Sequence, residues 1–497
     1  SDCQGNTYIT GIFQGSISFG TTILTSNEQA LFVAKLDKFG QWEWAISGIS
    51  PNMVESNGIT YSCETDFLYI TGSFISSLTL PDRIITNINP GKTLFVIKLD
   101  SDGNIIWHIT AGFVPSSESE GNSITINCNN NIYVTGEFEG TVNFGPSTLI
   151  SAGNNTDVFL AKLIDLGLSS AWDWAISAEN VDGDASGESL IADEFENVYV
   201  QGSFIGTLNF PGIDPLISED RAIFIAKANN ANWIWNLKVQ SNSDGSTGYG
   251  ITLSCDGSIF ITGTFFVEAI FFNLNPIILN GNGMNMFVSK IIDRGDSGEF
   301  IWAVKAGPNV GNDERSRTSI IAYKSSLYLT GIIEGGQVFF GPQIIFSPGA
   351  NAFIAKLNNQ GIWQWAVISD AQAGGLARGV SITTDCLANI YITGSLINVV
   401  NFGSITLDSI NLVPYIAKLS DDREVEMVGV ALESGATGET IDVSYCESDN
   451  IYNDLITGSN YYIGEDGRPS NNCRCPRCPR FIGIACSATR LLFQSTP

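Results

Sequence analysis

A short pattern, an aromatic residue followed by an aliphatic residue, usually threonine, and then glycine, occurs seven times in this 497-residue chain. Self-similarity at a fixed period is typical of units that bury their apolar faces against neighbouring copies. This period constrains the fold more than any other feature, and we number the repeats one to seven in chain order. The glycines of the pattern, 61 to 68 residues apart, are Gly11, Gly72, Gly136, Gly202, Gly263, Gly331 and Gly394.

Each repeat contains up to four segments in which apolar residues alternate with small or polar ones, a period typical of β-strands. Strand a is exemplified by residues 58–63, strand b carries the glycine pattern, strand c resembles Phe-Val-Ala-Lys-Leu, and strand d holds all ten tryptophans. Turns rich in Asp and Gly, such as 37–40, separate strands c and d and suit tight hairpins. We therefore expect one four-stranded antiparallel sheet per repeat.

Such a sheet has two apolar faces and needs packing on both, which radial closure provides. The sequence therefore predicts an all-β chain: a seven-bladed β-propeller over residues 1–422 and a small C-terminal β domain over 423–497. A linear solenoid is the alternative. The 51 glycines and the charged fraction of only 15% fit a turn-rich all-β protein.

The repeat motifs Tyr-Ile-Thr-Gly and Phe-Val-Ala-Lys-Leu, with an aromatic strand after a glycine turn, resemble the bacterial beta-propeller repeat (SBBP) family. The resemblance covers residues 1 to about 420. It implies a propeller fold but no particular function, because propellers carry many unrelated functions.

Both ends of the repeat array are irregular. Asp2-Cys3 aligns with the end of a strand a, so we expect the natural chain to begin earlier, and residues 424–429 lack the tryptophan of a strand d. Either 424–429 is a degenerate strand d, or a strand from elsewhere completes the seventh blade. Residues 439–446 resemble a strand a and could complete the first blade. Alternatively, the whole tail is a separate domain, since 428–435, 461–467 and 482–489 resemble small C-terminal domains of tail-fibre and giant-virus particle proteins.

The tail also contains a cysteine-rich segment, Cys473-Arg474-Cys475-Pro476-Arg477-Cys478, followed by Cys486. Cysteine thiolates at such spacing can converge on a tetrahedral zinc ion, although two prolines stiffen the segment and a second Cys-x2-Cys pair is missing. Disulfides and free thiols are the alternatives. The arginines form the one basic cluster of the chain and suggest docking onto an acidic neighbouring subunit.

Five other cysteines occupy one equivalent position at the end of strand a. Equivalent positions in neighbouring blades are generally farther apart than the limit of about 7 Å between the Cα atoms of a disulfide. We therefore expect small buried apolar residues without disulfides. They are Cys3, Cys63, Cys128, Cys255 and Cys386.

Acidic residues gather in the loops between strands d and a, which should share one face of the propeller with the b-to-c loops. Carboxylates ringed on that face could bind Ca²⁺ through their oxygens; the alternative is a solvated loop surface. These candidate binding-face residues are Glu55, Glu118, Glu120, Asp182, Asp184, Asp244, Asp313 and Glu314.

One lysine recurs in every strand c, and we expect its alkyl stem to lie near the tryptophans while its ammonium reaches a carboxylate. A residue copied in every repeat is structural rather than catalytic. The single histidine, His108, excludes a multi-histidine metal site. The lysines are Lys35, Lys98, Lys162, Lys227, Lys290, Lys356 and Lys418.

The net charge of −27 argues against nucleic-acid binding, and no run of eighteen apolar residues predicts a membrane span. The sequence predicts a non-enzymatic structural or adhesion protein of a virus particle or cell surface. Its partners would be subunits of the same assembly, most simply further copies of the chain, and its outward face could meet a glycan. A lectin-like or sugar-active propeller and an intracellular, cytoplasmic interaction scaffold are the alternatives.

Overall fold

The structure, a computed structural model, describes most of residues 1–419 and short strands beyond them. The residues outside it are 3, 88–90, 113–116, 154, 242–245, 309–317, 386–388, 404, 420–427, 432–459, 464–468, 471–480, 488–489 and 493–497. The described residues form strands and turns without an α-helix. None of them belongs to a helix long and apolar enough to span a membrane.

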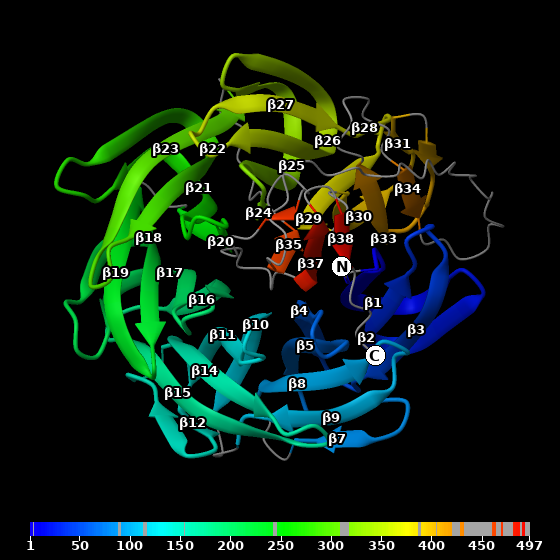
Figure 1. The fold of residues 1–497 in the computed structure, drawn as a ribbon, viewed down its shortest axis with the longest axis horizontal. Coiled ribbons are helices and arrows are strands. Elements are labelled where there is room, and N and C mark those ends of the chain that lie inside the picture. Colours follow the sequence, from blue (N-terminus) through cyan, green and yellow to red (C-terminus); the bar gives the residue numbers. More distant parts are fainter. Residues whose placement is uncertain are drawn as a thin grey trace.

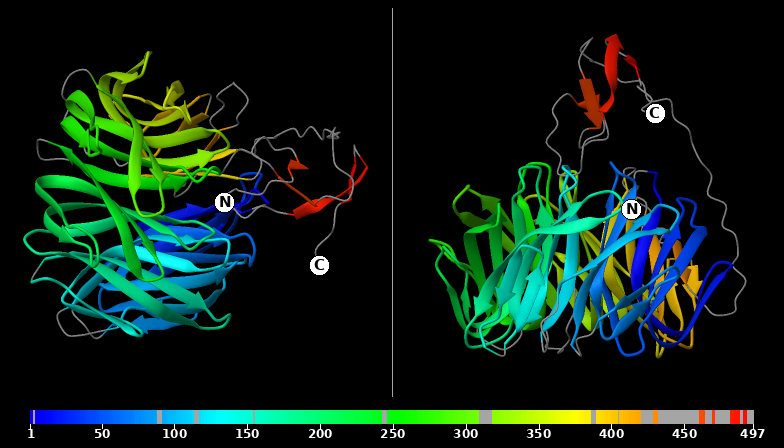
Figure 2. Two further views of the ribbon diagram at one scale, coloured as in Figure 1. Left: turned by 60° about the vertical axis from the view of Figure 1, so that its left-hand side comes forward. Right: turned by 90° about the horizontal axis from the view of Figure 1, so that it is seen from below.

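The second repeat shows the unit of the fold. Its four strands, β4 (Val54–Ser62), β5 (Phe67–Phe74), β8 (Thr93–Asp100) and β9 (Ile105–Thr110), form one antiparallel sheet in chain order. Figure 1 shows such sheets arranged radially around a central axis, with strands a innermost and strands d outermost. Their strand ends are exposed on two opposite faces of the ring (Figure 2). The prediction of an all-β propeller is thereby confirmed.

The other repeats follow the same plan. In every repeat the aromatic residue of the glycine pattern lies opposite the repeated lysine of strand c, for example Tyr8 opposite Lys35 and Tyr391 opposite Lys418. In repeat three, strands a to d are β10 (Glu118–Ile126), β11 (Ile132–Glu139), β14 (Asp157–Asp165) and β15 (Ser170–Asn180), and in repeat four they are β16 (Ala185–Ala192), β17 (Val198–Asn209), β18 (Leu216–Asn229) and β19 (Asn232–Ser241). In repeat five they are β20 (Thr247–Leu253), β21 (Ile259–Phe271), β22 (Ile277–Asp293) and β23 (Gly298–Pro308). In repeat six they are β24 (Ser319–Tyr323), β25 (Ser326–Phe340), β26 (Gln343–Asn358) and β27 (Trp363–Ile368).

The two ends of the array differ from this plan. In the described residues, repeat one has β1 (Thr7–Phe19), β2 (Thr22–Leu36) and β3 (Trp42–Ile49), and no strand precedes β1. Repeat seven has β29 (Leu376–Thr384), β30 (Ile390–Ile397), β33 (Val413–Leu419) and β34 (Val428–Ala431). Strand β34 pairs with β33 and places Val428 opposite Lys418, where other repeats place an aromatic residue. Residues 428–431 therefore occupy the position of strand d in repeat seven, in agreement with the expectation that 424–429 is a degenerate strand d; residues 424–427 lie outside the described residues.

The first and last repeats pack against each other. Ile9, Phe19 and Phe32 of repeat one share one apolar cluster with Tyr391 and Ile416 of repeat seven. The Tyr391 hydroxyl also donates a hydrogen bond to the Gly5 carbonyl, 3.5 Å away. A linear solenoid would leave these two ends apart, so the ring contradicts that alternative. The segment 439–446 lies outside the described residues.

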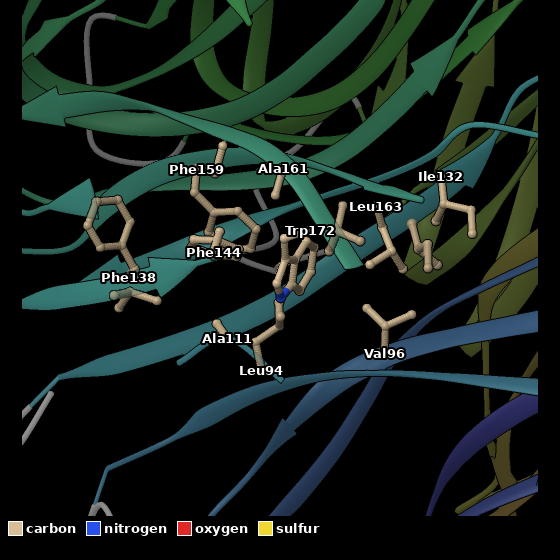
Figure 3. Packing of buried hydrophobic residues seen from close by; sticks show 14 of the residues in the cluster. Leu94, Val96, Ala111, Ile132, Phe138, Phe144, Phe159, Ala161, Leu163 and Trp172 are labelled. Atoms are coloured by element: carbon tan, nitrogen blue, oxygen red, sulfur yellow. The ribbon is translucent and has the colours of Figure 1, made fainter. Parts of the chain in front are cut away.

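The core lies between neighbouring sheets. One cluster joins Leu94 and Val96 of repeat two to Ile132, Phe159 and Trp172 of repeat three, and Figure 3 shows these side chains interdigitating between the two sheets. Burying a large apolar side chain contributes about 1.5–3 kcal/mol. Each sheet therefore depends on both neighbours for its stability.

A second connection between repeats comes from the chain between strands b and c, which extends outward as a hairpin. In repeat two this hairpin is β6 (Ser77–Thr79) and β7 (Ile84–Thr86), and β6 pairs with β3, the strand d of repeat one. Equivalent pairings link β15 to β17, β19 to β21, and β23 to β25. In repeats three and seven the hairpin strands are β12 (Thr141–Phe144), β13 (Ser147–Ile150), β31 (Val400–Phe402) and β32 (Ile405–Leu407), and β31 pairs with β28 (Asp370–Ala371).

Beyond the ring the structure describes a separate antiparallel sheet in the tail. Its order is β36 (Pro469–Ser470), β35 (Asn460–Ile463), β37 (Phe481–Ser487) and β38 (Arg490–Leu492). The division of the tail into a domain of its own stays a prediction.

Candidate functional site

The innermost strands carry a β-bulge beside the glycine pattern. The register shifts at Asn57 in repeat two and at Asn122 in repeat three. A bulge re-aims the side chain of its extra residue, and here both asparagines reach the next repeat. The Asn57 amide donates to the Glu120 carboxyl (3.1 Å) and to the Gly121 carbonyl (3.2 Å), while Asn122 donates to Ser186 and Gly187.

Next to each bulge, one position of strand a varies in chemistry: it is glutamate in repeats two and three, and serine, threonine and arginine in repeats four, five and seven. These residues lie opposite strand b at the same register and belong to the innermost strands (Figure 1). Because the surrounding residues repeat and this position does not, the inner end of the ring is where individual repeats differ in chemistry. The residues are Glu55, Glu120, Ser186, Thr247 and Arg378.

Glu55 and Glu120 meet at this position around one lysine. Lys92, in the b-to-c loop of repeat two, places its Nζ 2.6 Å from Glu120 and 3.4 Å from Glu55. The two carboxyl groups also share a hydrogen bond with each other, and the Ser73 hydroxyl donates to Glu55 over 3.3 Å. Glu55 and Glu120 were expected in d-to-a loops, but they lie in strands β4 and β10, beside Lys92 of the b-to-c loop. We call Glu55, Glu120 and Lys92 the inner acidic cluster.

The environment moves the pKa values of the two carboxyl groups in opposite directions. Burial, together with the hydrogen bond that its protonated carboxyl donates to Glu55, raises the pKa of Glu120 to about 7. The hydrogen bond accepted from Glu120 and the charge of Lys92 lower the pKa of Glu55. Glu137 lies directly opposite Glu120 on β11, and burial raises its pKa as well. One proton is therefore held between Glu55 and Glu120 near neutral pH.

This arrangement limits the chemistry that the cluster can perform. Glycosidases that use two carboxyl groups hold them about 5–9.5 Å apart, with the substrate bond or a water between them. Carboxyl groups that hydrogen-bond to each other are closer than that. As it stands, the cluster can share a proton and join repeats two and three, but it leaves no room for a sugar between its carboxyl groups.

Of the remaining predicted face residues, the three that the structure describes, Glu118, Asp182 and Asp184, do not join the cluster as ligands. Asp182 accepts hydrogen bonds from Thr207, and Asp184 accepts them from Thr156, so both carboxylates support their own loops. Glu118 is exposed. Among the described residues, no three Asp, Glu, His or Cys side chains gather as a metal site would require, so the expected calcium site finds no support there. Asp244, Asp313 and Glu314 lie outside the described residues.

The tail cysteines proposed as zinc ligands or disulfide partners cannot be placed. Cys473, Cys475 and Cys478 lie outside the described residues, and of Cys486 only the backbone, in β37, is described. Zinc binding by these residues remains a prediction.

The prediction for the repeated cysteines is wrong for Cys63, which is exposed and disulfide-bonded. It directly follows β4 in the turn to β5, where the side chain faces solvent rather than the core. Cys128 and Cys255 are half-buried.

The repeated lysines behave as predicted in repeats two and four. Lys98 is 1% exposed, and its Nζ lies 2.6 Å from Asp165 of repeat three. The same carboxylate accepts hydrogen bonds from the Tyr69 hydroxyl (2.7 Å) and the Trp107 indole (3.0 Å). Although burial alone would raise the pKa of Asp165, these three donors lower it. Lys227, Tyr199 and Trp235 bind Asp293 of repeat five in the same way.

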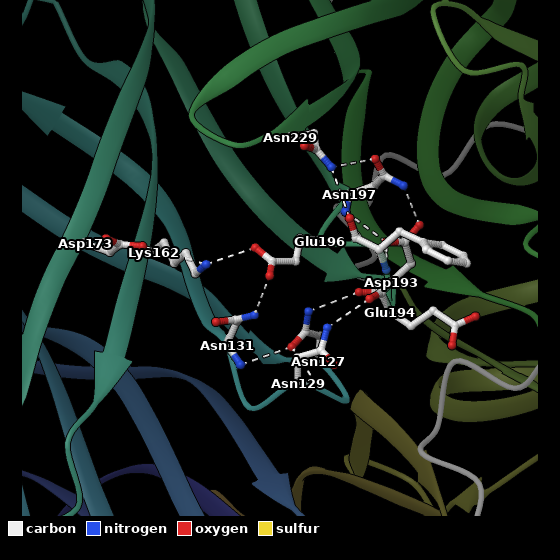
Figure 4. Close-up of polar contacts among 11 residues, drawn as sticks. Asn127, Asn129, Asn131, Lys162, Asp173, Asp193, Glu194, Glu196, Asn197 and Asn229 are labelled. Carbon is white, nitrogen blue, oxygen red and sulfur yellow. Dashed lines mark hydrogen bonds and ion pairs between the residues drawn. The ribbon is translucent and has the colours of Figure 1, made fainter.

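The junction between repeats three and four uses different residues for the same purpose, as Figure 4 shows. Lys162 contacts Glu196 at 2.9 Å, and Asn131 donates to the same carboxylate. Asn127 and Asn129 donate to the backbone carbonyls of Asp193 and Glu194. Sequence reasoning missed these contacts because their partners belong to the next repeat, 34 to 66 residues away.

Comparisons with known proteins find no family model and no curated protein that matches this chain. The SBBP resemblance therefore stays a prediction. Distantly similar structures include virginiamycin B lyase from Staphylococcus aureus (12% identity, 75% of this chain and 83% of that chain, TM-score 0.36). A protein of unknown function from Dyadobacter fermentans (7%, 69% and 90%, 0.37) and a leech intramolecular trans-sialidase (8%, 87% and 88%, 0.34) are similar to the same degree. Similarities this distant carry no information about activity.

Proposed function

We propose that this chain is a seven-bladed propeller that serves as a non-enzymatic structural or adhesion protein on a particle or cell surface. The observation that supports this most is that the inner acidic cluster is itself a contact between two repeats. Lys92 and Asn57 satisfy its carboxyl groups, and the repeated lysines bind neighbouring repeats in the same manner. Charged groups that are paired with one another in this way stabilise the ring and are not free to bind a substrate.

The test is a search for turnover. The full chain and its Glu120→Gln variant are incubated with a panel of polysaccharides and glycoconjugates, and released products are measured by mass spectrometry. We expect no product from either protein. Product release by the wild type that disappears in the variant would overturn the proposal.

A sugar-active propeller is the second candidate, and one observation favours it. Paired carboxyl groups whose pKa values are driven apart are the usual arrangement of an acid and a base in catalysis. In this alternative Glu120 is the acid and Glu55 the base, and substrate entry separates them. This alternative requires a rate of sugar cleavage that falls as pH rises through about 7, the pKa of Glu120.

The tail would attach the ring to its assembly. Because β34 completes repeat seven, a deletion that tests this role begins at residue 432 rather than at 423. We expect the deleted chain to fold, with an unchanged melting temperature for the ring, but to lose retention on the particle or cell of origin. Retention without the tail would refute the attachment role.

The Cys63 disulfide supports a location outside the cytoplasm, since disulfides persist mainly in oxidising compartments. Thiol titration of the denatured, unreduced protein tests this. We expect fewer than the ten thiols that the sequence contains, whereas ten free thiols would favour the intracellular scaffold.

A further inference from the structure

The outer rim of the ring exposes one isoleucine in each of six repeats. All six lie in the hairpins between strands b and c, which Figure 1 places at the periphery, for example β7 and β12. Their exposed fractions lie between 51% and 64%, unusual for so regular a set of large apolar residues. They are Ile23, Ile84, Ile150, Ile217, Ile278 and Ile344.

These side chains are not part of the core. In repeat two Ile85 points inward and is buried, while its neighbour Ile84 points to the other side of the hairpin. The residue paired with the exposed isoleucine is often small and polar, such as Ser18 opposite Ile23 and Thr79 opposite Ile84. A solvent-facing strand normally carries polar or charged residues at such positions.

The paired strand positions next to the hairpin turns also lack charge. In all seven repeats, the three residue pairs closest to the hairpin turn contain no Asp, Glu, Lys or Arg, although the chain has 51 acidic and 24 basic residues. Natural strands at a sheet edge are commonly protected from association by charged side chains. These paired positions lack this protection. Charged side chains occur beside them, such as Asp82 and Arg83 in the turn of repeat two and Lys305, which donates to the Asn280 carbonyl in repeat five.

The apolar surface is largest on repeat five. Ile270 lies opposite Ile278, and at the end of the hairpin Leu274 is fully exposed and Phe272 is 39% exposed. Two hydrogen bonds between Asn273 and the Phe300 backbone hold this end against β23, which brings the exposed Ile301 beside it. We call Ile270, Phe272, Leu274, Ile278 and Ile301 the rim patch.

We propose that the rim, centred on the rim patch, is the surface through which copies of this chain bind one another side by side. This inference rests on the proposed structural function and names the partner. With a net charge of −27, two copies repel each other wherever carboxylates face carboxylates. A basic partner would bind the acidic faces instead. The rim patch contains no carboxylate and has the Lys238 ammonium 4.6 Å from the Phe272 ring, so it suits an equally acidic neighbour.

The distribution of the isoleucines adds to this. Two identical hairpins can meet about a two-fold axis, each presenting the same side chains to the other. Because equivalent hairpins surround the ring, one molecule can make such contacts in more than one direction, as a packed layer requires.

Sedimentation velocity of the full chain tests the proposal. We expect a concentration-dependent oligomer that becomes a monomer in a Leu274→Lys, Ile278→Lys double variant, with at least a tenfold weaker association constant. The matched control is Leu168→Lys, which changes an 86%-exposed leucine in a c-to-d turn and should leave association unchanged. Leu274→Ser with Ile278→Ser is the milder pair, used if the lysine variant melts earlier than the wild type.

Two outcomes overturn the proposal: a wild type that stays monomeric up to about 100 µM, a concentration at which even weak specific contacts are populated, or an oligomer that survives both double variants. The chain truncated after residue 431 separates this inference from the attachment role. If truncation alone abolishes the oligomer, self-association belongs to the tail and the proposed role of the rim is wrong. Turnover in the polysaccharide assay would refute the proposed function but would leave the proposed role of the rim unaffected.

Discussion

Two lysine contacts join repeat two to repeat three, and they differ in what surrounds them. Lys98 is buried and meets Asp165, whose pKa is lowered by three donors, and the same arrangement recurs at Lys227. Lys92 is 28% exposed and lies between two carboxyl groups with opposite pKa shifts. The positions of these two glutamates are occupied by Ser186 and Thr247 in later repeats. The repeated contact serves the fold, while the single one gives the inner end of the ring its particular chemistry.

The largest expected loss of stability comes from breaking the repeated contact, for which Lys98 and Asp165 are the example. Asp165→Ala leaves the Lys98 ammonium buried without its carboxylate and removes the acceptor of Tyr69 and Trp107. Breaking such a buried pair costs about 3–5 kcal/mol in the free energy of unfolding, measured in urea. The exposed pair Arg294 and Glu299 is the control, and Glu299→Ala should cost no more than about 1 kcal/mol. Equal losses in the two variants would contradict the structural role.

The second effect concerns Cys63. Cys63→Ser removes a disulfide and should lower the free energy of unfolding by about 2–4 kcal/mol under non-reducing conditions. Adding reductant should bring the wild type to the level of the variant and leave the variant unaffected. Cys128→Ser is the matched control from the equivalent position of repeat three, with a loss of less than about 1 kcal/mol expected. A wild type insensitive to reductant would count against the disulfide.

A smaller effect tests the bulge that shapes the inner acidic cluster. A Cβ added at Gly136 would lie 1.9 Å from the Glu120 carbonyl oxygen, so Gly136→Ala must displace β10. We expect a loss of about 1–3 kcal/mol, as for overpacking elsewhere. Gly349→Ala, where a Cβ meets nothing within 4 Å, should be close to neutral. If the two glycines tolerate alanine equally, β10 does not approach β11 as closely as described.

The smallest effect is the pH dependence of the inner acidic cluster. Between the ordinary value of 4.5 and about 7, the folded chain keeps a proton on Glu120 that the unfolded chain has released. The free energy of unfolding therefore falls as pH rises across this window and levels above it. Glu55 acts at more acidic pH, because its lowered pKa gives stability that is lost only as pH falls below its ordinary value.

Glu120→Gln should flatten this slope relative to the wild type, because glutamine does not titrate. The comparison with the wild type is needed because Asp157, whose pKa burial raises to about 6, contributes a slope of the same sign. Glu118→Gln on the exposed surface is the control and should keep the wild-type slope. An unchanged slope in Glu120→Gln would show that no proton is held in the cluster.

Much of the fold was predictable from the sequence because the same strand pattern recurs in every repeat. Alternation identified the strands, and the lysine of strand c was correctly expected near the tryptophans and a carboxylate, as Lys98 shows. The outward hairpins and their pairing with the preceding repeat were missed, since a three-residue strand such as β6 has too little alternation to be recognised.

The candidate site was only partly predictable. Glu55 and Glu120 were expected in d-to-a loops but lie in strands β4 and β10, and Lys92 and the bulged Asn57 were not singled out. Contacts between residues of different repeats depend on the angle between neighbouring sheets, which the sequence of one repeat does not contain. The error at Cys63 has a local cause, because the residue lies exposed in the turn after β4 rather than in the core.

A pair of double-mutant cycles tests most directly whether the repeated contact, rather than the single one, holds the ring together. The first cycle combines Lys98→Met with Asp165→Ala, and the second combines Lys92→Met with Glu120→Gln, each followed by urea unfolding. The account predicts a coupling energy of about 2–3 kcal/mol for the buried pair and less than about 1 kcal/mol for the more exposed pair. A larger coupling in the Lys92 cycle than in the Lys98 cycle would contradict it.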